Sequence, residues 1–228
     1  LIPHIPNILL RLNQTVEDII RIQPDLVVTI DAPGFNFRLG KKLKAIKNHQ
    51  IPLLHITAPT VWAWKPKRAQ KVAQFLDHLL ALFPFEPPYF TEKGLDCTFM
   101  GHPFVEKLDT LQDKSAFLKK YHLDAHDPIL CILPGSRRGE INHHLPLFLD
   151  SIELLRQHDR SLQLVFPTLP ELEPLISQAL FDRGMAGKII TDPADRLSAM
   201  AFAKGALAAS GTVSLELALL GVPMLIAY

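Results

Sequence analysis

Two stretches of the sequence place small, polar and charged residues directly after a short apolar run. The run at 129–133, "ILCIL", precedes "PGSRRGE" at 134–140, and the run at 205–209, "GALAA", precedes "SGTVSLE" at 210–216. A strand that turns tightly into a helix directs free backbone N–H groups and the positive end of the helix dipole to one spot. Each stretch therefore predicts a binding site for an anion such as phosphate.

The first turn adds basic side chains to its backbone donors. A guanidinium from Arg137 or Arg138 can make a charge-assisted contact to a phosphate oxygen. The predicted nucleotide-binding residues of this turn are Ser136, Arg137 and Glu140, of which Glu140 lies where the helix begins. A solvated basic turn with Ser136 as a helix cap is an equal interpretation of this stretch on its own.

The second turn supplies hydroxyl groups and a carboxylate. Ser210, Gly211 and Thr212 begin the predicted helix, and Glu216 lies further along it. The Glu216 carboxylate can accept hydrogen bonds from the two hydroxyls of a ribose. In the alternative, Ser210 or Thr212 caps the helix and Glu216 is a surface residue. Because two such turns occur in the same half of the chain, we favour a nucleoside diphosphate that uses both.

A further carboxylate follows a predicted strand in the first half of the chain. Within "IDAPGFNF" at 30–37, Asp31 ends the strand, and Pro33 and Gly34 turn the chain toward a helix. Asp31 can act as a general base where a substrate hydroxyl reaches it. The simpler interpretation of this stretch alone is that Asp31 caps the turn.

The segment "APTVWAWKPKR" at 58–68 combines two tryptophans with a basic end. Its candidate acceptor-binding or membrane-binding residues are Trp62, Trp64, Lys65, Lys67 and Arg68. They can form an amphipathic surface for acyl chains and a phosphate. Alternatively, the tryptophans pack in the core and the basic end is solvated. The sequence leaves both interpretations open.

The rest of the sequence predicts the elements that position these residues. Near-continuous apolar runs, typical of strands buried on both faces, occur at 25–30, 51–57, 78–82, 129–133, 162–166, 188–190, 205–209 and 223–227. Helical patterns lie between them at 36–49, 140–157, 170–183, 194–203 and 212–220. This alternation predicts an α/β fold with parallel sheets. Ligands of such sheets bind at the carboxyl ends of the strands, which the candidate residues follow.

The alternation is interrupted at 101–113, "GHPFVEKLDTLQD". This segment predicts a linker between two Rossmann-like halves, 1–108 and 109–228. We expect the first half to lack its opening strands. We also expect the chain to be part of a longer protein, since it ends at Tyr228 on a predicted strand that no helix follows.

Composition limits the function classes. The 228 residues are 48% hydrophobic and carry a formal net charge of +1, so there is enough apolar surface for one or two cores and no overall attraction to nucleic acid. Cys97 and Cys131 lie far apart in apolar runs, which predicts buried free thiols in a reducing compartment.

Neither a secretion signal nor a membrane span is expected. The chain does not open on a charged segment followed by an apolar one, which a signal peptide requires. The long apolar stretch at 205–228 is interrupted by polar residues, glycines and a proline. It therefore predicts a strand, a turn, a helix and a second strand rather than a transmembrane helix.

Several motifs together resemble the lipid-A-disaccharide synthase family. In order, they are "IDAPGFN", "TAPTVWAWKPKR", "LALFPFEPPYF", "GHPFVE", "LPGSRRGEI" and "ASGTVSLELALLGVPMLIAY", and they span almost the whole chain. The resemblance implies a GT-B-like fold, with two Rossmann-like parallel-sheet domains that face a cleft and an incomplete N-terminal domain. It also implies an inverting glycosyltransferase that joins UDP-2,3-diacylglucosamine to 2,3-diacylglucosamine 1-phosphate and releases UDP, with no cofactor and no required metal.

Carried over by position, the resemblance puts UDP at the two anion-binding turns and makes Asp31 the candidate base. It implies a cytoplasmic enzyme bound peripherally to the anionic surface of the inner membrane. The chain departs from the family pattern in lacking its N-terminal Gly-Glu-Thr-Ser-Gly-Asp motif and the portion after Tyr228. Gly34 also stands where an acidic residue is common, and Ala58 and Thr60 replace common serines. A UDP-sugar epimerase or hydrolase and a non-catalytic nucleotide-binding module stay open as alternatives, and no oligomeric state is predicted.

Overall fold

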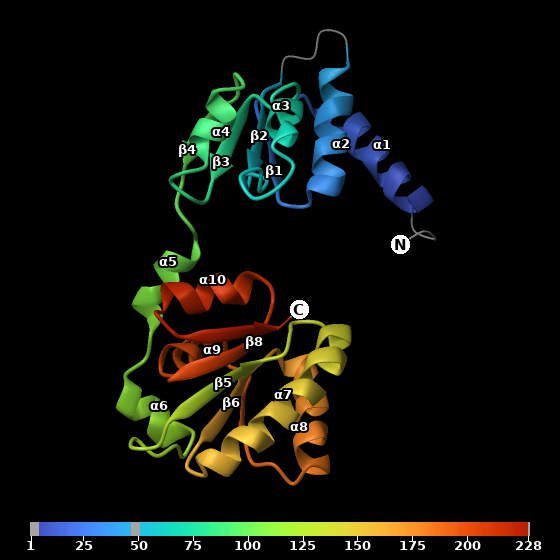
Figure 1. The fold of residues 1–228 in the computed structure, drawn as a ribbon. Coiled ribbons are helices and arrows are strands. Elements are labelled where there is room, and N and C mark those ends of the chain that lie inside the picture. The colour runs from blue at the N-terminus through green and yellow to red at the C-terminus, as the bar shows by residue number, and fades with distance from the viewer. Residues whose placement is uncertain (1–4, 47–50, 228) are drawn as a thin grey trace. The chain divides into compact units, whose positions relative to one another are not determined.

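The computed structural model of the protein describes residues 5–46 and 51–227 (Figure 1). The chain divides into two compact units between His102 and Pro103. The sequence predicts this division near residue 108. The structure has it earlier because Phe104 is buried in the core of the second unit.

The first unit contains a parallel sheet of four strands in the order β1-β2-β3-β4. Its strands are Val27–Ile30 (β1), Leu53–Ile56 (β2), His78–Ala81 (β3) and Asp96–Phe99 (β4). Its helices are Ile5–Ile22 (α1), Pro33–Lys44 (α2), Lys67–Val72 (α3) and Pro87–Thr91 (α4). Gly40 of α2 is required by close packing, because a Cβ there would lie 2.7 Å from side-chain atoms of both Leu53 and Phe75.

The second unit contains a parallel sheet of five strands in the order β7-β6-β5-β8-β9. Its strands are Ile129–Leu133 (β5), Gln163–Pro167 (β6), Lys188–Ile190 (β7), Gly205–Ala209 (β8) and Met224–Ala227 (β9). Its α-helices are Phe104–Lys107 (α5), Lys114–Lys120 (α6), Arg138–His158 (α7), Glu173–Asp182 (α8), Pro193–Ala201 (α9) and Thr212–Leu219 (α10). Short 3₁₀ turns are formed by Leu108–Thr110 and Pro170–Leu172.

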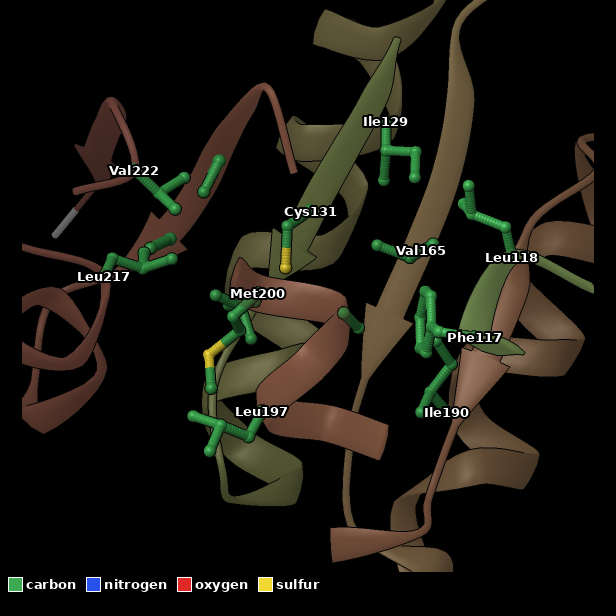
Figure 2. Packing of buried hydrophobic residues seen from close by; sticks show 14 of the residues in the cluster. Phe117, Leu118, Ile129, Cys131, Val165, Ile190, Leu197, Met200, Leu217 and Val222 are labelled. Atoms are coloured by element: carbon green, nitrogen blue, oxygen red, sulfur yellow. The ribbon is translucent and has the colours of Figure 1, made fainter. Parts of the chain in front are cut away.

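Both faces of the central strands β5, β6 and β8 of the second sheet are buried. Neighbouring residues of β5 point to opposite faces, so Cys131 joins one core and Ile132 the other. Figure 2 shows the first core, where Cys131 and Val165 of the sheet lie beside Phe117 of α6 and Met200 of α9. The second core packs the sheet against α7 and α8. Burial on both faces explains the near-continuous apolar runs of these central strands. The same prediction was wrong for β1 and β9, where Val28, Ile30, Leu225 and Ile226 are exposed.

The structure confirms the predicted fold class and each predicted strand and helix, with boundaries that move by a few residues. Residues 47–50 of the predicted helix at 36–49 lie outside the described residues. The prediction was incomplete in omitting α1, α3, α4, α5, α6 and β4. The strand β4 is largely exposed and has only a short apolar stretch, and only Leu12 of α1 is buried.

The long apolar stretch near the C-terminus forms β8, α10 and β9, as predicted. Within residues 5–46 and 51–227, no helix has the length and hydropathy to cross a bilayer. Cys97 and Cys131 are both free thiols, as predicted, but only Cys131 is buried, whereas Cys97 is half-buried. Burial raises the pKa of the Cys97 thiol to about 11 and that of Cys131 above its ordinary value, so both stay protonated at neutral pH.

Candidate functional site

A pocket of about 370 Å³ lies at the carboxyl ends of the strands in the second unit. Its wall is formed by the loops after β5, β6 and β8 and by residues of α5, α7, α9 and α10. Strand β5 lies between β6 and β8, so the order of the chain reverses at this edge of the sheet. Open parallel sheets bind ligands at such a switch point.

The pocket brings together the two turns that the sequence singles out. Its lining includes Ser136, Glu140, Ser210, Gly211, Thr212 and Glu216. Arg137, the remaining residue of the predicted nucleotide-binding set, is not part of the lining, and its side chain is 80% exposed. The geometry thus groups residues from two turns that are far apart in the sequence, with one arginine outside.

The turn after β5 is shaped around Glu140. The Ser136 backbone N–H donates to Glu140 Oε2 at 2.9 Å, and Arg137 Nη1 donates to Glu140 Oε1 at 2.5 Å. These two hydrogen bonds, the one from Ser136 first, hold the pKa of the Glu140 carboxyl below its usual value. The carboxylate therefore occupies the position at the start of α7 where an external anion would find its first backbone donor.

Gly135 makes this arrangement possible. Its φ of +134° is in the region that favours glycine, and a Cβ there would lie 2.5 Å from Glu140 Cβ and 2.8 Å from Glu140 Oε2. Any other residue would strain the turn and displace the carboxylate. By contrast, a Cβ on Gly139 would have no atom within 4 Å.

The turn after β8 leaves its helix start open. The Ser210 backbone N–H donates to the Ala227 carbonyl at 2.9 Å, which ties the turn to β9. Ser214 Oγ donates to the Gly211 carbonyl at 2.6 Å. Among the described residues, no side chain accepts a hydrogen bond from the start of α10. Its first N–H groups and the helix dipole are therefore available to an anion.

Sequence reasoning missed two polar residues of the pocket. Thr168 directly follows β6, is 6% exposed, and its Oγ1 has no hydrogen-bond partner among the described residues. Arg196 of α9 donates from Nη1 to the Thr168 carbonyl at 3.4 Å and also lines the pocket. The rule that ligand-binding residues follow strand ends would have selected Thr168, whereas Arg196 has no such local signal.

The helix that carries Arg196 is fixed by a buried acid. Asp195 is 0% exposed and accepts hydrogen bonds from Lys120 and from Tyr121, the latter at 2.5 Å between Oη and Oδ2. Burial alone would raise the pKa of Asp195, but the hydrogen bonds from Lys120 and Tyr121 hold it below its usual value. This ion pair fastens α9, and with it one wall of the pocket, to the end of α6.

In the first unit, Asp31 lies exposed in the turn between β1 and α2. Its backbone N–H donates to the Ile56 carbonyl at 2.5 Å, which joins the turn to β2. Asp31 and Ala32 both have left-handed backbone conformations, with φ of 49° and 43°. The structure therefore presents the candidate base on a tightly held turn after a strand.

The strand next to β1 carries a buried histidine. His55 of β2 is 1% exposed, and its Nδ1 lies 2.8 Å from Thr29 Oγ1 on the neighbouring strand. Its ring also packs edge-on against Phe37, with 4.9 Å between the ring centroids. Burial lowers the pKa of His55 to about 4, so the imidazole is neutral at physiological pH.

Both tryptophans of the basic segment are at the surface. Trp62 is 46% exposed and Trp64 is 58% exposed, which favours the surface interpretation over the core one. Lys65 Nζ lies over the Trp64 ring, 3.8 Å from its centroid, and Arg68 lies over Phe37. Aromatic rings and cations thus share this surface.

Trp62 is held in place by a hydrogen bond to the buried Glu86. Its Nε1 donates to Glu86 Oε1 at 3.3 Å, and Glu86 is 3% exposed. The other carboxylate oxygen of Glu86 accepts the backbone N–H groups of Leu82 and Phe83 at 3.1 and 3.0 Å. The "LFPFE" segment therefore fixes one of the two surface rings.

Comparison with protein families matches the whole chain, residues 1–228, to the family described as lipid-A-disaccharide synthetase. The chain is 46% identical to a lipid-A-disaccharide synthase of Rhodospirillum centenum and 43% identical to that of Rickettsia akari. Both alignments cover 100% of this chain but 57% of the relative. The chain thus spans little more than half the length of these relatives.

Solved structures show a similar fold at low sequence identity. The S. aureus MnaA–UDP co-structure aligns with a TM-score of 0.65 at 19% identity, over 95% of this chain and 60% of that one. A UDP-N-acetylglucosamine 2-epimerase from Rickettsia bellii aligns with a TM-score of 0.64 at 19% identity, over 96% of this chain and 60% of that one. This likeness supports the GT-B-like fold class and nothing more specific.

Proposed function

Because the chain belongs to the lipid-A-disaccharide synthase family, we propose that it carries both substrate-binding parts of an inverting hexosyltransferase. The enzyme joins UDP-2,3-diacylglucosamine to 2,3-diacylglucosamine 1-phosphate and yields lipid A disaccharide 1-phosphate and UDP. The observation that carries the proposal in the structure is the single pocket that six predicted nucleotide-binding residues line. The family match supports UDP as that nucleotide.

UDP is proposed to occupy the pocket of the second unit. The open start of α10 supplies N–H groups to the diphosphate, and Glu216 accepts from the ribose hydroxyls. Arg196 and Lys107, which also line the pocket, supply positive charge. The buried hydroxyl of Thr168 would gain a hydrogen-bond partner from a bound nucleotide.

The proposed reaction is a single displacement. The primary hydroxyl of the acceptor attacks the anomeric carbon, Asp31 takes the proton of that hydroxyl, and the bond between the anomeric carbon and the UDP oxygen breaks. The leaving diphosphate develops negative charge, and helix N-termini and basic side chains at the pocket stabilise it without a cofactor or a metal. Inversion follows because attack occurs opposite the leaving group.

The acylated substrates and an anionic membrane are proposed to meet the surface around Trp62 and Trp64. Exposed rings accommodate acyl chains, and Lys65, Lys67 and Arg68 attract phosphate groups. The proposal therefore includes a peripheral position at the cytoplasmic side of the inner membrane. The proposal includes no nucleic acid partner.

Two parallel reactions with the full-length protein test the proposal. The first contains UDP-diacylglucosamine and diacylglucosamine 1-phosphate, and the second contains UDP-N-acetylglucosamine without acceptor. We expect disaccharide and UDP in the first reaction and an unchanged sugar nucleotide in the second. Epimerised or hydrolysed UDP-N-acetylglucosamine, with no disaccharide, would instead support the epimerase alternative. UDP binding with no reaction in either tube would support a non-catalytic module.

A further inference from the structure

The turn that carries Asp31 has an unusual backbone. Asp31 and Ala32 are consecutive, neither is glycine, and both have positive φ, at 49° and 43°. For residues with a Cβ this left-handed conformation is disfavoured, and two in succession require compensation from the surrounding structure. Ala32 is also the N-cap of α2, and its methyl group gives no hydrogen bond to the helix start.

One side chain provides that compensation. Asn36 Nδ2 donates to the Ile30 carbonyl at 3.1 Å and to the Asp31 carbonyl at 2.7 Å. A primary amide has two N–H donors, so a single nitrogen can serve both carbonyls at once. The Asn36 backbone N–H also donates to the Ala32 carbonyl at 3.0 Å, so Asn36 is held in the first turn of α2.

The other side of the turn is held as well. The Asp31 N–H donates to the Ile56 carbonyl at 2.5 Å, so the peptide groups on both sides of Asp31 Cα have fixed partners. With these peptide planes fixed, the direction in which the Asp31 side chain leaves the backbone is fixed too. The carboxylate is exposed and no hydrogen bond to another side chain orients it in the described residues, so the backbone is what aims it.

We propose that Asn36 is a positioning residue for Asp31: its amide holds the left-handed turn and so aims the carboxylate at the acceptor hydroxyl. The inference rests on the proposed function, in which Asp31 is the base. The competing explanation is that Asn36 only stabilises the start of α2. In that case its loss would reduce stability without acting through the carboxylate.

A double-mutant cycle in the full-length enzyme separates these explanations. Asn36→Ala is expected to lower kcat by about 10-fold to 100-fold, the scale of a small misplacement of a catalytic group, with unchanged UDP affinity. Asp31→Asn is expected to lower kcat further. The double variant is expected to match Asp31→Asn alone, because a turn that no longer carries a base has nothing to aim.

Asn13→Ala is the matched control. Asn13 lies on α1 of the same unit and its Oδ1 accepts from Lys42 Nζ at 2.8 Å, so the variant loses an exposed asparagine hydrogen bond away from the turn. We expect its kcat to equal that of the wild type. Should Asn36→Ala not fold, Asn36→Ser retains one donor and enters the same cycle.

Near-normal kcat in a folded Asn36→Ala enzyme would overturn the inference, and so would effects of the two substitutions that multiply in the double variant. Near-normal kcat in Asp31→Asn would instead overturn the assignment of Asp31 as the base. The two failures are therefore distinguishable from the same four rates.

Discussion

Arg137 donates to Glu140, with 2.5 Å between Nη1 and Oε1, so the arginine of the turn after β5 already has an acidic partner. Its side chain is 80% exposed, so this ion pair lies at the surface. Since Glu140 also accepts the Ser136 N–H, the pair occupies the start of α7. A phosphate that binds there must take over donors that now serve Glu140.

We therefore predict that Arg137 exchanges its carboxylate partner for phosphate when UDP binds. Arg137→Ala should weaken UDP binding by about 10-fold to 100-fold, the usual consequence of losing a charge-assisted hydrogen bond. Arg138→Ala is the control, because it removes an equal charge from the neighbouring exposed position. Calorimetric titration gives both affinities, and equal losses in the two variants would show only a general charge effect.

Gly135→Ala tests the geometry of the same turn. A Cβ at a φ of +134°, 2.5 Å from Glu140 Cβ, forces either the backbone or Glu140 to move. We expect a loss of about 1–2 kcal/mol in the free energy of unfolding from the backbone alone, and weaker UDP binding. Gly139→Ala, where a Cβ meets no atom within 4 Å, should lose neither. Wild-type UDP affinity in Gly135→Ala would separate the turn from the nucleotide site.

Thr168→Val asks whether the buried hydroxyl meets a ligand. Without ligand, Thr168 Oγ1 has no partner among the described residues, so its removal should stabilise the protein by about 1 kcal/mol. If a bound nucleotide supplies the partner, the same variant should bind UDP more weakly. Denaturation with and without UDP measures both changes. Unchanged UDP affinity would exclude a hydroxyl contact to the ligand.

Strands were predictable from sequence where apolar residues follow one another. In β5 both sheet faces are buried, whereas in β1 the exposed positions Val28 and Ile30 are apolar too. The residues 129–133 and 205–209 coincide with β5 and β8 in the structure. The elements that were missed carry weaker signals, since β4 is largely exposed and α4 has five residues. Local pattern therefore predicts the elements whose apolar residues form a continuous run or a periodic face.

The candidate site was predictable in part, for a related reason. Residues that follow a strand in a polar turn, such as Ser136 and Ser210, are visible in the sequence. Arg196 reaches the pocket because Asp195 fastens α9 against α6, a contact between positions 75 residues apart in the sequence. The Asn36 amide likewise acquires its role only when the turn before it becomes left-handed. Such roles depend on tertiary contacts.

His55 predicts a pH dependence of stability. Its pKa is about 4 in the folded state, against an ordinary 6.5, so the unfolded chain binds a proton before the folded one does. Stability is therefore full above about pH 6.5 and falls by about 3 kcal/mol as the pH drops to about 4. Urea titrations followed by the fluorescence of Trp62 and Trp64, the chain's two tryptophans, report on this unit.

The matched variant for this prediction is His55→Asn, which keeps a polar atom near Thr29 Oγ1 but has no titrating group. It will be less stable at every pH because the ring no longer packs against Phe37. Between pH 6.5 and pH 4, however, its stability should fall less steeply than that of the wild type. Parallel curves for the two proteins would mean that His55 is solvated and protonates freely.

The surface around Trp64 predicts salt-dependent binding to anionic lipid. Trp64 is 58% exposed beneath the Lys65 cation, and Lys67 and Arg68 follow it in the chain. Exposed charges are screened by salt, whereas insertion of a ring is not. Vesicles that contain phosphatidylglycerol should therefore shift the tryptophan fluorescence to shorter wavelength at low salt and progressively less as salt is added. Neutral vesicles should cause little shift, and Trp64→Ala should bind anionic vesicles more weakly while Trp64→Phe stays close to wild type.

If anionic vesicles at low salt leave the fluorescence unchanged, this surface does not meet a membrane. Its rings would then serve the acyl chains of the substrate alone, which turnover of the acylated acceptor by Trp64→Ala would measure.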